Sequence, residues 1–267
     1  MAQLRTNVAR REKYRKLYGY FPDDGPLRRE LYPRHMEFFA AGGVHEPMPS
    51  CPPDCDGAPH RDRCVLAANR VGKTESIGGF EVATHLTGRY QPWWPGHRWS
   101  HPIDAWASGK TNETTRDIVQ KKLFGAVKWI GRVKSLDGTG LIPLEDIGAV
   151  TWKRGIQDFV DTVKVRHRGG GWSTIGLKSY EQGRGGFEGT EKDLIWDDEE
   201  PPQDIREEQA MRLMTQRGHL LSTFTPMEGM SVVVQEFLPN GGLPPRLEER
   251  AATAWYREHI LGVAAAA

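Results

Sequence analysis

The spacing of apolar and polar residues along the chain predicts alternating strands and helices. Short apolar runs that are typical of buried strands occupy residues 64–68, 102–108, 193–198 and 218–225. Apolar residues at helical spacing occupy residues 74–85, 112–123 and 203–216. Two further strand-like segments flank a run of three glycines, which is typical of a hairpin, at residues 161–167 and 173–179. We therefore expect an α/β fold, with a mainly parallel sheet, helices on both faces and one antiparallel excursion.

Changes in composition divide the chain into three parts. We expect a helical N-terminal arm and an insertion rich in cysteine and proline at residues 1–60, a globular core at residues 61–238, and a linker or subdomain remnant at residues 239–267. The 267 residues are 38% hydrophobic and 27% charged, which is ordinary for a soluble globular protein. No apolar run approaches membrane-spanning length, and the N-terminus lacks an apolar signal segment. These features indicate a cytoplasmic protein without a membrane contact.

The net charge of +1 gives no overall signature of nucleic-acid binding. Residues 1–34 are nevertheless locally basic. Such an arm could contact DNA phosphates or an acidic protein, and a solvated helix face is the alternative.

The first candidate for chemistry is the loop between the first predicted strand and helix. Its sequence is Ala67-Ala68-Asn69-Arg70-Val71-Gly72-Lys73-Thr74. This matches a phosphate-binding loop except that Ala67 stands where the first glycine is expected. In such a loop, backbone N–H groups surround phosphate oxygens, Lys73 reaches the β- and γ-phosphates, and the Thr74 hydroxyl binds Mg²⁺. We therefore predict a nucleotide site; the alternative is an ordinary strand, turn and helix.

A second candidate lies at the end of the predicted strand 193–198. Its apolar residues lead into Asp197, Asp198 and Glu199, and two prolines then end the strand. A buried strand that ends in carboxylates is typical of the metal and water site of a nucleotide hydrolase. We expect Asp198 to hold Mg²⁺ and Glu199 to polarise the attacking water. In the alternative register, Asp197 holds Mg²⁺ and Asp198 polarises the water. A solvated acidic turn without a catalytic role is the other alternative.

A third candidate is the polar end of the last predicted strand. The residues there are Thr223-Phe224-Thr225-Pro226. At this position in a RecA-like nucleotidase, a polar strand end would lie beside the γ-phosphate, where it could sense the loss of that phosphate. The three motifs together predict a P-loop NTPase of the RecA-like (ASCE) type.

The three cysteines fall between residues 51 and 64, with a histidine among them. Three thiolates and one imidazole can form a tetrahedral zinc site, so Cys51, Cys55, His60 and Cys64 are candidate ligands. Free reduced thiols, with Cys64 in the core, are the alternative. A further hypothesis is a non-hydrolysing module, in which a degenerate loop accompanies a zinc-stapled docking element.

Together these motifs resemble the ATPase domain of the large terminase subunits of tailed bacteriophages, the motors that package DNA into procapsids. The resemblance extends over residues 30–235. It rests on five segments, at residues 67–74, 178–184, 187–189, 196–202 and 223–226. Residues 32–39 also resemble the family's segment associated with adenine binding, which implies a nucleotide contact at His35. The family usually has an apolar residue where this chain has Asp197.

The resemblance implies an Mg²⁺-dependent ATPase that drives double-stranded DNA into the procapsid, with Lys73 and Glu199 as catalytic residues. It makes Arg184 a candidate finger that stabilises the charge of the transition state, in cis or on a neighbouring subunit. Arg70 could act in this way from inside the loop. The alternative for Arg184 is a surface arginine in a glycine-rich loop.

The partners implied are double-stranded DNA, the small terminase subunit and the portal protein. We expect a homo-oligomeric ring at the portal vertex in the host cytoplasm, and a monomer in isolation. The family also carries a nuclease domain, which we do not expect here because the chain ends soon after Pro226. Another RecA-like DNA-dependent ATPase, of helicase or recombination type, is the alternative function.

Overall fold

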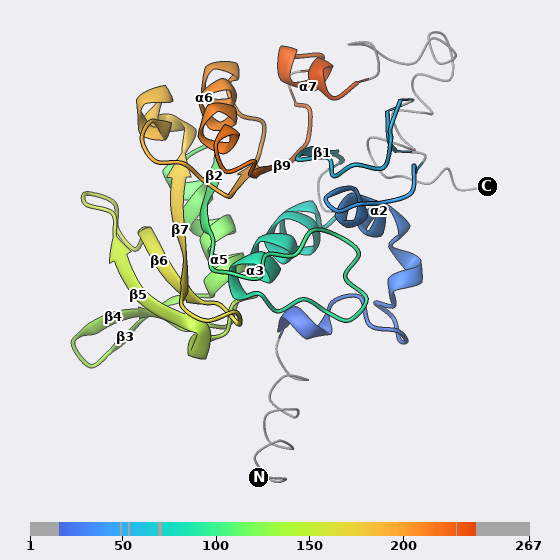
Figure 1. The fold of residues 1–267 in the computed structure, drawn as a ribbon. Coiled ribbons are helices and arrows are strands. Elements are labelled where there is room, and N and C mark those ends of the chain that lie inside the picture. Colours follow the sequence, from blue (N-terminus) through green and yellow to red (C-terminus); the bar gives the residue numbers. More distant parts are fainter. Residues whose placement is uncertain (1–15, 49, 53, 69–70, 228, 239–267) are drawn as a thin grey trace.

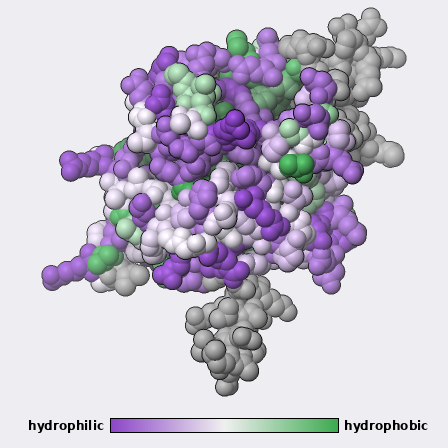
Figure 2. Space-filling model, viewed as in Figure 1, coloured by the Kyte–Doolittle hydropathy of each residue, from purple (hydrophilic) through white to green (hydrophobic). Residues whose placement is uncertain are grey.

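The computed structural model describes residues 16–48, 50–52, 54–68, 71–227 and 229–238 (Figure 1). The predictions for residues 1–15 of the basic arm and for residues 239–267 lie outside these ranges. In the part of the chain that is described, no helix is both long and apolar enough to cross a membrane. Figure 2 shows a face of mostly hydrophilic or neutral residues, on which apolar residues form small spots.

A seven-stranded sheet with the order β1, β9, β8, β2, β7, β6, β5 forms the centre of the fold. The strands are β1 (Asp62–Leu66), β2 (Asp104–Gly109), β5 (Ile147–Trp152), β6 (Val160–Arg166), β7 (Trp172–Ser179), β8 (Leu194–Asp198) and β9 (His219–Phe224). Neighbours from β1 to β7 are parallel, whereas β6 pairs antiparallel with both β7 and β5. The predicted mainly parallel α/β sheet is therefore confirmed. The predicted hairpin forms the antiparallel excursion.

The strand prediction was incomplete at the edges of the fold. The strand predicted at residues 64–68 lies at residues 62–66 instead. β5 was not predicted, and neither was the separate two-stranded sheet of β3 (Val127–Ile130) and β4 (Val133–Leu136). β5 contains no buried residue and its register with β6 is irregular, so it lacks the apolar pattern of a core strand.

Each of the three predicted helices is present. The one at 74–85 begins as a π-helical turn, η3 (Lys73–Gly79), and continues directly into α3 (Phe80–Thr87). The one at 112–123 comprises α4 (Asn112–Thr114), η4 (Thr115–Gln120) and α5 (Lys121–Phe124), and the last is α6 (Gln203–Met214). Shorter elements are η1 (Lys16–Gly19), η2 (Arg29–Leu31), α2 (Pro33–Ala41), η5 (Leu144–Asp146), η6 (Tyr180–Gln182), η7 (Arg184–Phe187) and α7 (Val232–Glu236).

The two faces of the sheet are covered by different helices (Figure 1). Leu194 and Trp196 of β8 belong to the core cluster that contains the residues of α3. Ile195 lies between them in sequence and belongs to a second cluster with Ile205 and Leu213 of α6. Successive strand residues point to opposite faces, so the parity of a residue in β8 decides which helix layer its side chain meets.

Helix α3 is buried along all eight of its residues. The sheet covers one side, and aromatic rings from the N-terminal segment cover another. Phe80 packs edge-on to Phe21 at a centroid distance of 5.3 Å and lies 5.5 Å from the ring of Phe39. Because this enclosure also buries Glu81 and His85, their polar groups need partners inside the protein.

A buried ion pair supplies those partners and ties β1 to α3. Nη2 of Arg63 lies 2.6 Å from Oε1 of Glu81, and the two side chains are 3% and 1% exposed. The same guanidinium donates through Nη1 to the carbonyl oxygen of Phe38 at 2.6 Å, and Nε2 of His85 lies 3.1 Å from Glu81 Oε1. Three elements, α2, β1 and α3, are therefore joined by one charged network.

We predict that Glu81→Ala lowers the free energy of unfolding by about 3–5 kcal/mol, because it leaves the Arg63 charge buried without its partner. Asp117→Ala is the control, since Asp117 is 47% exposed and its pairs with Arg116 and Lys121 lie at the surface. The control should lose less than about 1 kcal/mol. Guanidinium unfolding followed by tryptophan fluorescence gives both values. Equal losses in the two variants would contradict the role given to the buried pair.

Candidate active site

The predicted phosphate loop connects β1 to η3 at the carboxyl ends of the parallel strands. Gly72, the last residue before the helix, has a φ of 86°, in the left-handed region that favours glycine. A Cβ at this position would lie 2.7 Å from the Ser76 hydroxyl oxygen. The helix that starts at Lys73 directs its first N–H groups and its positive end toward the loop. Asn69 and Arg70 lie outside the described residues.

The ends of β8 and β9 meet this helix at one carboxylate. The Thr74 hydroxyl donates to Oδ1 of Asp198 at 2.8 Å, and the Thr223 hydroxyl donates to the same oxygen at 3.1 Å. The indole N–H of Trp196 donates to the Thr223 oxygen at 2.8 Å. Asp198 is 3% exposed, and Thr223 is fully buried. The sequence motifs at residues 74, 198 and 223 therefore come together in space.

Asp197 lies on the opposite face of β8. Its Oδ1 accepts hydrogen bonds from the Ser108 hydroxyl at 2.9 Å and from Nε2 of Gln209 at 2.7 Å. Gln209 belongs to α6, so Asp197 faces the helix layer that is remote from the loop. Of the two registers considered for the acidic strand end, the structure has Asp198, rather than Asp197, beside Thr74.

Lys73 joins the loop to the end of β9. Its ammonium group donates to Oγ1 of Thr225 at 2.7 Å and to the carbonyl oxygen of Ala68 at 3.3 Å. The Thr225 hydroxyl in turn donates to the carbonyl oxygen of Ala67 at 2.8 Å. Burial lowers the pKa of Lys73, and the nearby charges of Glu199 and Asp198 oppose this effect. A cationic group is thus held beside the two candidate carboxylates.

Glu199 has an unusual backbone. Its φ is 96°, which is uncommon for any residue other than glycine and costs about 1–3 kcal/mol. Two hydrogen bonds hold it there: its N–H donates to the Thr223 carbonyl oxygen at 3.2 Å, and its carbonyl oxygen accepts from the Tyr180 hydroxyl at 2.8 Å. The residue is half-buried at the point where β8 ends. Strain of this kind is often retained at sites of chemistry.

The motif at residues 223–226 divides between the two faces of the sheet. Thr223 and Thr225 face the loop, where they contact Asp198 and Lys73. Phe224 is fully buried in a different cluster, with Val233 and Val234 of α7 among its members. The same strand end therefore contacts the site at the phosphate loop through its threonines, and it contacts α7 through its phenylalanine.

His35 lies beside the first turn of the loop helix. Its Nε2 is 3.0 Å from the Ser76 hydroxyl, and the Ser76 hydroxyl donates to the Gly72 carbonyl oxygen at 2.8 Å. Its ring contacts those of Tyr32 and Phe21. Burial lowers the pKa of His35 to about 4, so the ring is neutral at physiological pH. The segment singled out at residues 32–39 is therefore next to the loop.

Sequence reasoning missed the network around Glu75, the residue after Thr74. The Tyr20 hydroxyl donates to Oε1 of Glu75 at 2.7 Å, and the ammonium groups of Lys16 and Lys122 pair with the same carboxylate. Burial alone would raise the pKa of Glu75, but these hydrogen bonds lower it to about 2. Lys16 lies in η1, Tyr20 directly follows η1, and Lys122 lies in α5. Because these positions are far from Glu75 in the sequence, no short sequence pattern connects them.

The ion-pair partner of Arg184 lies on α6, and no hydrogen bond or ion pair joins Arg184 to the described residues of the loop. The Nε and Nη2 atoms of Arg184 each lie 3.2 Å from Oε2 of Glu208, which also pairs with Arg212. The Arg184 side chain remains 47% exposed. The structure thus shows both an ion pair with α6 and access to solvent for this candidate finger.

The structure brings together three of the four candidate zinc ligands. Cys51, Cys55 and His60 converge with His45, which was not considered. Cys64 lies apart from them on β1, packed against the cluster that contains Leu66 and Phe224.

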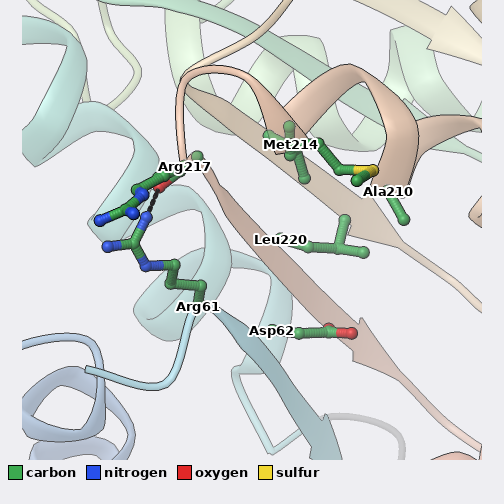
Figure 3. A pocket seen from close by; sticks show the side chains of 8 residues that line it. Arg61, Asp62, Ala210, Met214, Arg217 and Leu220 are labelled. Carbon is green, nitrogen blue, oxygen red and sulfur yellow. Dashed lines mark hydrogen bonds between the residues drawn. The ribbon is translucent and has the colours of Figure 1, made fainter. Parts of the chain in front are cut away.

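A separate pocket lies at the other end of the sheet. It has a volume of about 450 Å³ and is bordered by the start of β1, the end of α6 and the turn before β9 (Figure 3). The Arg61 guanidinium donates to the Arg217 carbonyl oxygen at its rim. The register of β1 with β9 places Asp62 opposite Leu220, at the amino ends of these strands. This pocket is therefore distinct from the nucleotide loop.

The apo site predicts a pH-dependent stability. Burial raises the pKa of Asp198 to about 7; Glu199 adds to the effect and hydrogen bonds from Thr74 and Thr223 oppose it. Because the folded state then binds the proton more tightly than the unfolded state, the free energy of unfolding should fall as the pH rises from about 4 to about 7.

Asp198→Asn should remove this contribution, so without nucleotide and metal it should be more stable than the wild type at pH 8. Each pKa unit is worth about 1.4 kcal/mol, so the gain should reach a few kcal/mol. Asp204→Asn, at an exposed residue in the first turn of α6, is the control. Urea unfolding between pH 4 and pH 8 measures the profiles. An unchanged slope in Asp198→Asn would disprove this assignment.

Comparisons with known proteins agree with the motifs. Residues 64–259 match the family described as "Terminase large subunit, T4likevirus-type, N-terminal". The terminase large subunit of Salmonella phage P22 is 36% identical over 205 residues, which are 69% of this chain and 39% of that protein. The chain thus spans well under half the length of this relative.

Two solved structures are also similar. One is a variant of the large terminase ATPase domain of Thermus phage P74-26, with 16% identity, a TM-score of 0.45, and coverage of 80% of this chain and 79% of that chain. The other is a large terminase of a thermophilic bacteriophage in complex with ADP, with 12% identity, a TM-score of 0.37, and coverage of 71% and 38%.

The family match includes β1, the loop helix, β8 and β9, which carry the three motifs. It favours a terminase over the helicase and recombination ATPases that were the alternative. Since the match extends over most of the sequence, the chain belongs to the family of terminase large subunit N-terminal domains.

Proposed function

We propose that this domain hydrolyses ATP with Mg²⁺ and uses the energy to move double-stranded DNA into a viral procapsid. The observation that carries the proposal is the contact of 2.8 Å between the Thr74 hydroxyl and the Asp198 carboxylate, beside the buried Lys73. Membership of the terminase family supports the biological role.

The donor set at this contact fits Mg²⁺. A hydroxyl oxygen from Thr74 and a carboxylate oxygen from Asp198 are hard oxygen ligands, which Mg²⁺ prefers together with water and phosphate oxygens. Mg²⁺ held by Thr74 and Asp198 would supply positive charge that neutralises the charge developing on the phosphates. Asp197 is excluded from this role, because its carboxylate faces α6.

The residues around the loop have separate tasks in the reaction. On nucleotide binding, the ammonium group of Lys73 exchanges its bond with Thr225 for one with phosphate oxygens. Glu199 lies near enough to Lys73 for its charge to oppose the effect of burial on the pKa of that ammonium group, and its carboxylate orients a water for attack on the γ-phosphate and accepts the proton. The two backbone bonds of Glu199 keep it in place during this step.

The strand β9 is suited to couple hydrolysis to movement. Its threonines contact both sides of the site: Thr223 bonds to Asp198, and Thr225 bonds to Lys73. A change in the partners of Lys73 therefore alters the hydrogen bonding of the strand end. Phe224 carries that change to α7, which packs on it.

The nucleotide base has a candidate contact in His35. Its neutral imidazole can donate or accept one hydrogen bond and lies one turn from the phosphate loop, through Ser76. We propose that α2 presents this ring to adenine. The partners proposed for the complete protein are double-stranded DNA, the small terminase subunit and the portal protein, in a ring at the portal vertex.

The arginine finger is proposed to be Arg184, with Arg70 as the alternative. Arg184 is bound to Glu208 in the absence of nucleotide and is half exposed. It would leave this ion pair to reach the γ-phosphate of its own or a neighbouring subunit. The Glu208 side chain is buried, at 3% exposure, but it keeps its ion pair with Arg212 when Arg184 leaves.

Substitution of the catalytic residues should separate binding from turnover. Glu199→Gln should lower phosphate release by at least about 100-fold and leave ATP affinity nearly unchanged, because it removes a general base. Lys73→Ala should weaken ATP binding itself. Glu200→Gln, next in the sequence, is the matched control and should retain turnover. Phosphate release and binding of a fluorescent ATP analogue give the two readouts.

Full turnover in both Lys73→Ala and Glu199→Gln would contradict the proposal. Tight ATP binding by the wild type with no turnover, even with DNA and the other packaging components, would instead support a non-hydrolysing module.

A pair of substitutions should distinguish a finger from a structural ion pair. Arg184→Ala should lower turnover by at least about tenfold without a change in ATP affinity. Glu208→Gln frees the arginine and should leave turnover at or above the wild-type value. If the two variants share the same loss of stability and both keep wild-type turnover, Arg184 only attaches η7 to α6. Thermal unfolding and steady-state phosphate release measure these effects.

A further inference from the structure

Two histidines and two cysteines converge in the segment between α2 and β1, near the amino end of β1. They are His45, Cys51, Cys55 and His60, and their four ligand atoms all lie within 4.8 Å of one another. We propose that they bind one structural Zn²⁺ ion. The proposal does not depend on the ATPase function, because the contacts of the four residues lie within their own segment and not with the described residues of the loop.

Three N···S distances among the ligand atoms match those of a tetrahedral zinc site. Nε2 of His45 lies 3.3 Å from Sγ of Cys51 and 3.5 Å from Sγ of Cys55, and Nε2 of His60 lies 3.4 Å from Sγ of Cys55. With Zn–S bonds of about 2.3 Å and Zn–N bonds of about 2.0–2.1 Å at tetrahedral angles, the N···S edge is about 3.5 Å. The protein therefore holds the donors at the spacing that the ion requires.

Hydrogen bonds among the four side chains cannot satisfy all of these contacts. Nδ1 of His45 lies 2.9 Å from the Gly43 carbonyl oxygen, which can only accept, so Nδ1 carries the proton and Nε2 is an acceptor. That single acceptor faces two sulfur atoms, and the Cys55 thiol, with one hydrogen, faces two imidazoles. A cation at the centre satisfies every donor atom at once.

The backbone also prepares the site for a metal. The N–H groups of Met48 and Gly57 each lie 3.4 Å from a sulfur atom, that of Cys51 and that of Cys55 respectively. Such bonds orient the two side chains and would complement the charge of metal-bound sulfur. The bond from His45 Nδ1 to a carbonyl orients the imidazole, as is usual for metal-bound histidine.

The segment has little else to hold it together. Among its described residues between 44 and 61, no apolar side chain is buried, and no helix or strand forms. Two backbone bonds, from His45 N to Gly57 O and from His60 N to Ala41 O, bring its ends together. Small segments without a hydrophobic core commonly depend on a metal or disulfide for stability. Zinc is the expected ion because two thiolates and two imidazoles in a tetrahedron suit it.

The ligand set differs from the one expected from cysteine spacing. His45 replaces Cys64, whose side chain belongs to the core beside Leu66. A zinc ion held by residues 45–60 would fix the end of α2 to the start of β1. It would thus support the position of α2, which carries His35.

Metal analysis of the purified chain tests the proposal. After expression with added zinc and purification without chelators, elemental analysis should give one zinc per chain. Replacement by Co²⁺ should give the intense visible bands of a tetrahedral ion and a near-ultraviolet thiolate charge-transfer band. Because this readout uses the wild-type protein, it does not depend on the folding of any variant.

Substitutions then identify the ligands. Cys51→Ser and His45→Gln should lose most of the zinc, whereas Cys64→Ala, the matched control, should keep one zinc per chain. The thermal unfolding midpoint should fall on chelation of the wild type and of Cys64→Ala, but not of His45→Gln.

Three results would overturn the assignment. They are far less than one zinc per wild-type chain, an octahedral Co²⁺ spectrum, and zinc that is lost in Cys64→Ala but retained in His45→Gln.

Discussion

The hydrogen bond between Thr74 and Asp198 is the contact on which the proposed site depends. It joins the first residues of the loop helix to the end of β8, and Thr223 adds the end of β9 to the same carboxylate oxygen. The contact is possible because parallel neighbours in a sheet bring their carboxyl ends to one edge. Burial also accounts for the raised pKa of Asp198, since desolvation of the carboxylate outweighs the hydrogen bonds from Thr74 and Thr223 and the nearby charge of Lys73.

The parallel strands, the hairpin, the loop and the three motifs could be predicted from the sequence, because short apolar runs and Gly-Lys-Thr are local signals. The sequence could not decide whether Asp197 or Asp198 faces the loop, although the answer follows from the alternation of side chains along the strand. Asp198 shares the face of Trp196, and Asp197 shares the face of Ile195. The alternation of side chains along a strand predicts which residues share a face. Only the packing of α3 and α6 shows which of the two faces meets the loop.

Contacts between distant segments account for the other omissions. His45 lies upstream of the cysteines and joins them only when the segment folds back, through its backbone bond to Gly57. Arg184 pairs with Glu208 because η7 packs on α6. The sequence around neither residue predicts this ion pair. β5 was missed because it is partly exposed and irregular. In each case, tertiary contacts decide a feature that local sequence cannot.

The N-terminal segment packs against the helix of the proposed nucleotide site. It encloses α3 with Phe21 and Phe39, it brings His35 to Ser76, and it contributes Tyr20 to the carboxylate of Glu75. Enclosure of α3 forces Glu81 inside the protein, and the ion pair with Arg63 compensates for that burial. Stability of the arm and geometry of the loop are therefore linked.

The most direct test of the account is a crystal structure with Mg²⁺ and a non-hydrolysable ATP analogue. We predict that the metal binds between the Thr74 hydroxyl and the Asp198 carboxylate, and that Lys73 leaves Thr225 for the phosphates. A metal bound by Asp197, or a Lys73 that keeps its bond to Thr225 with nucleotide present, would contradict the proposed site.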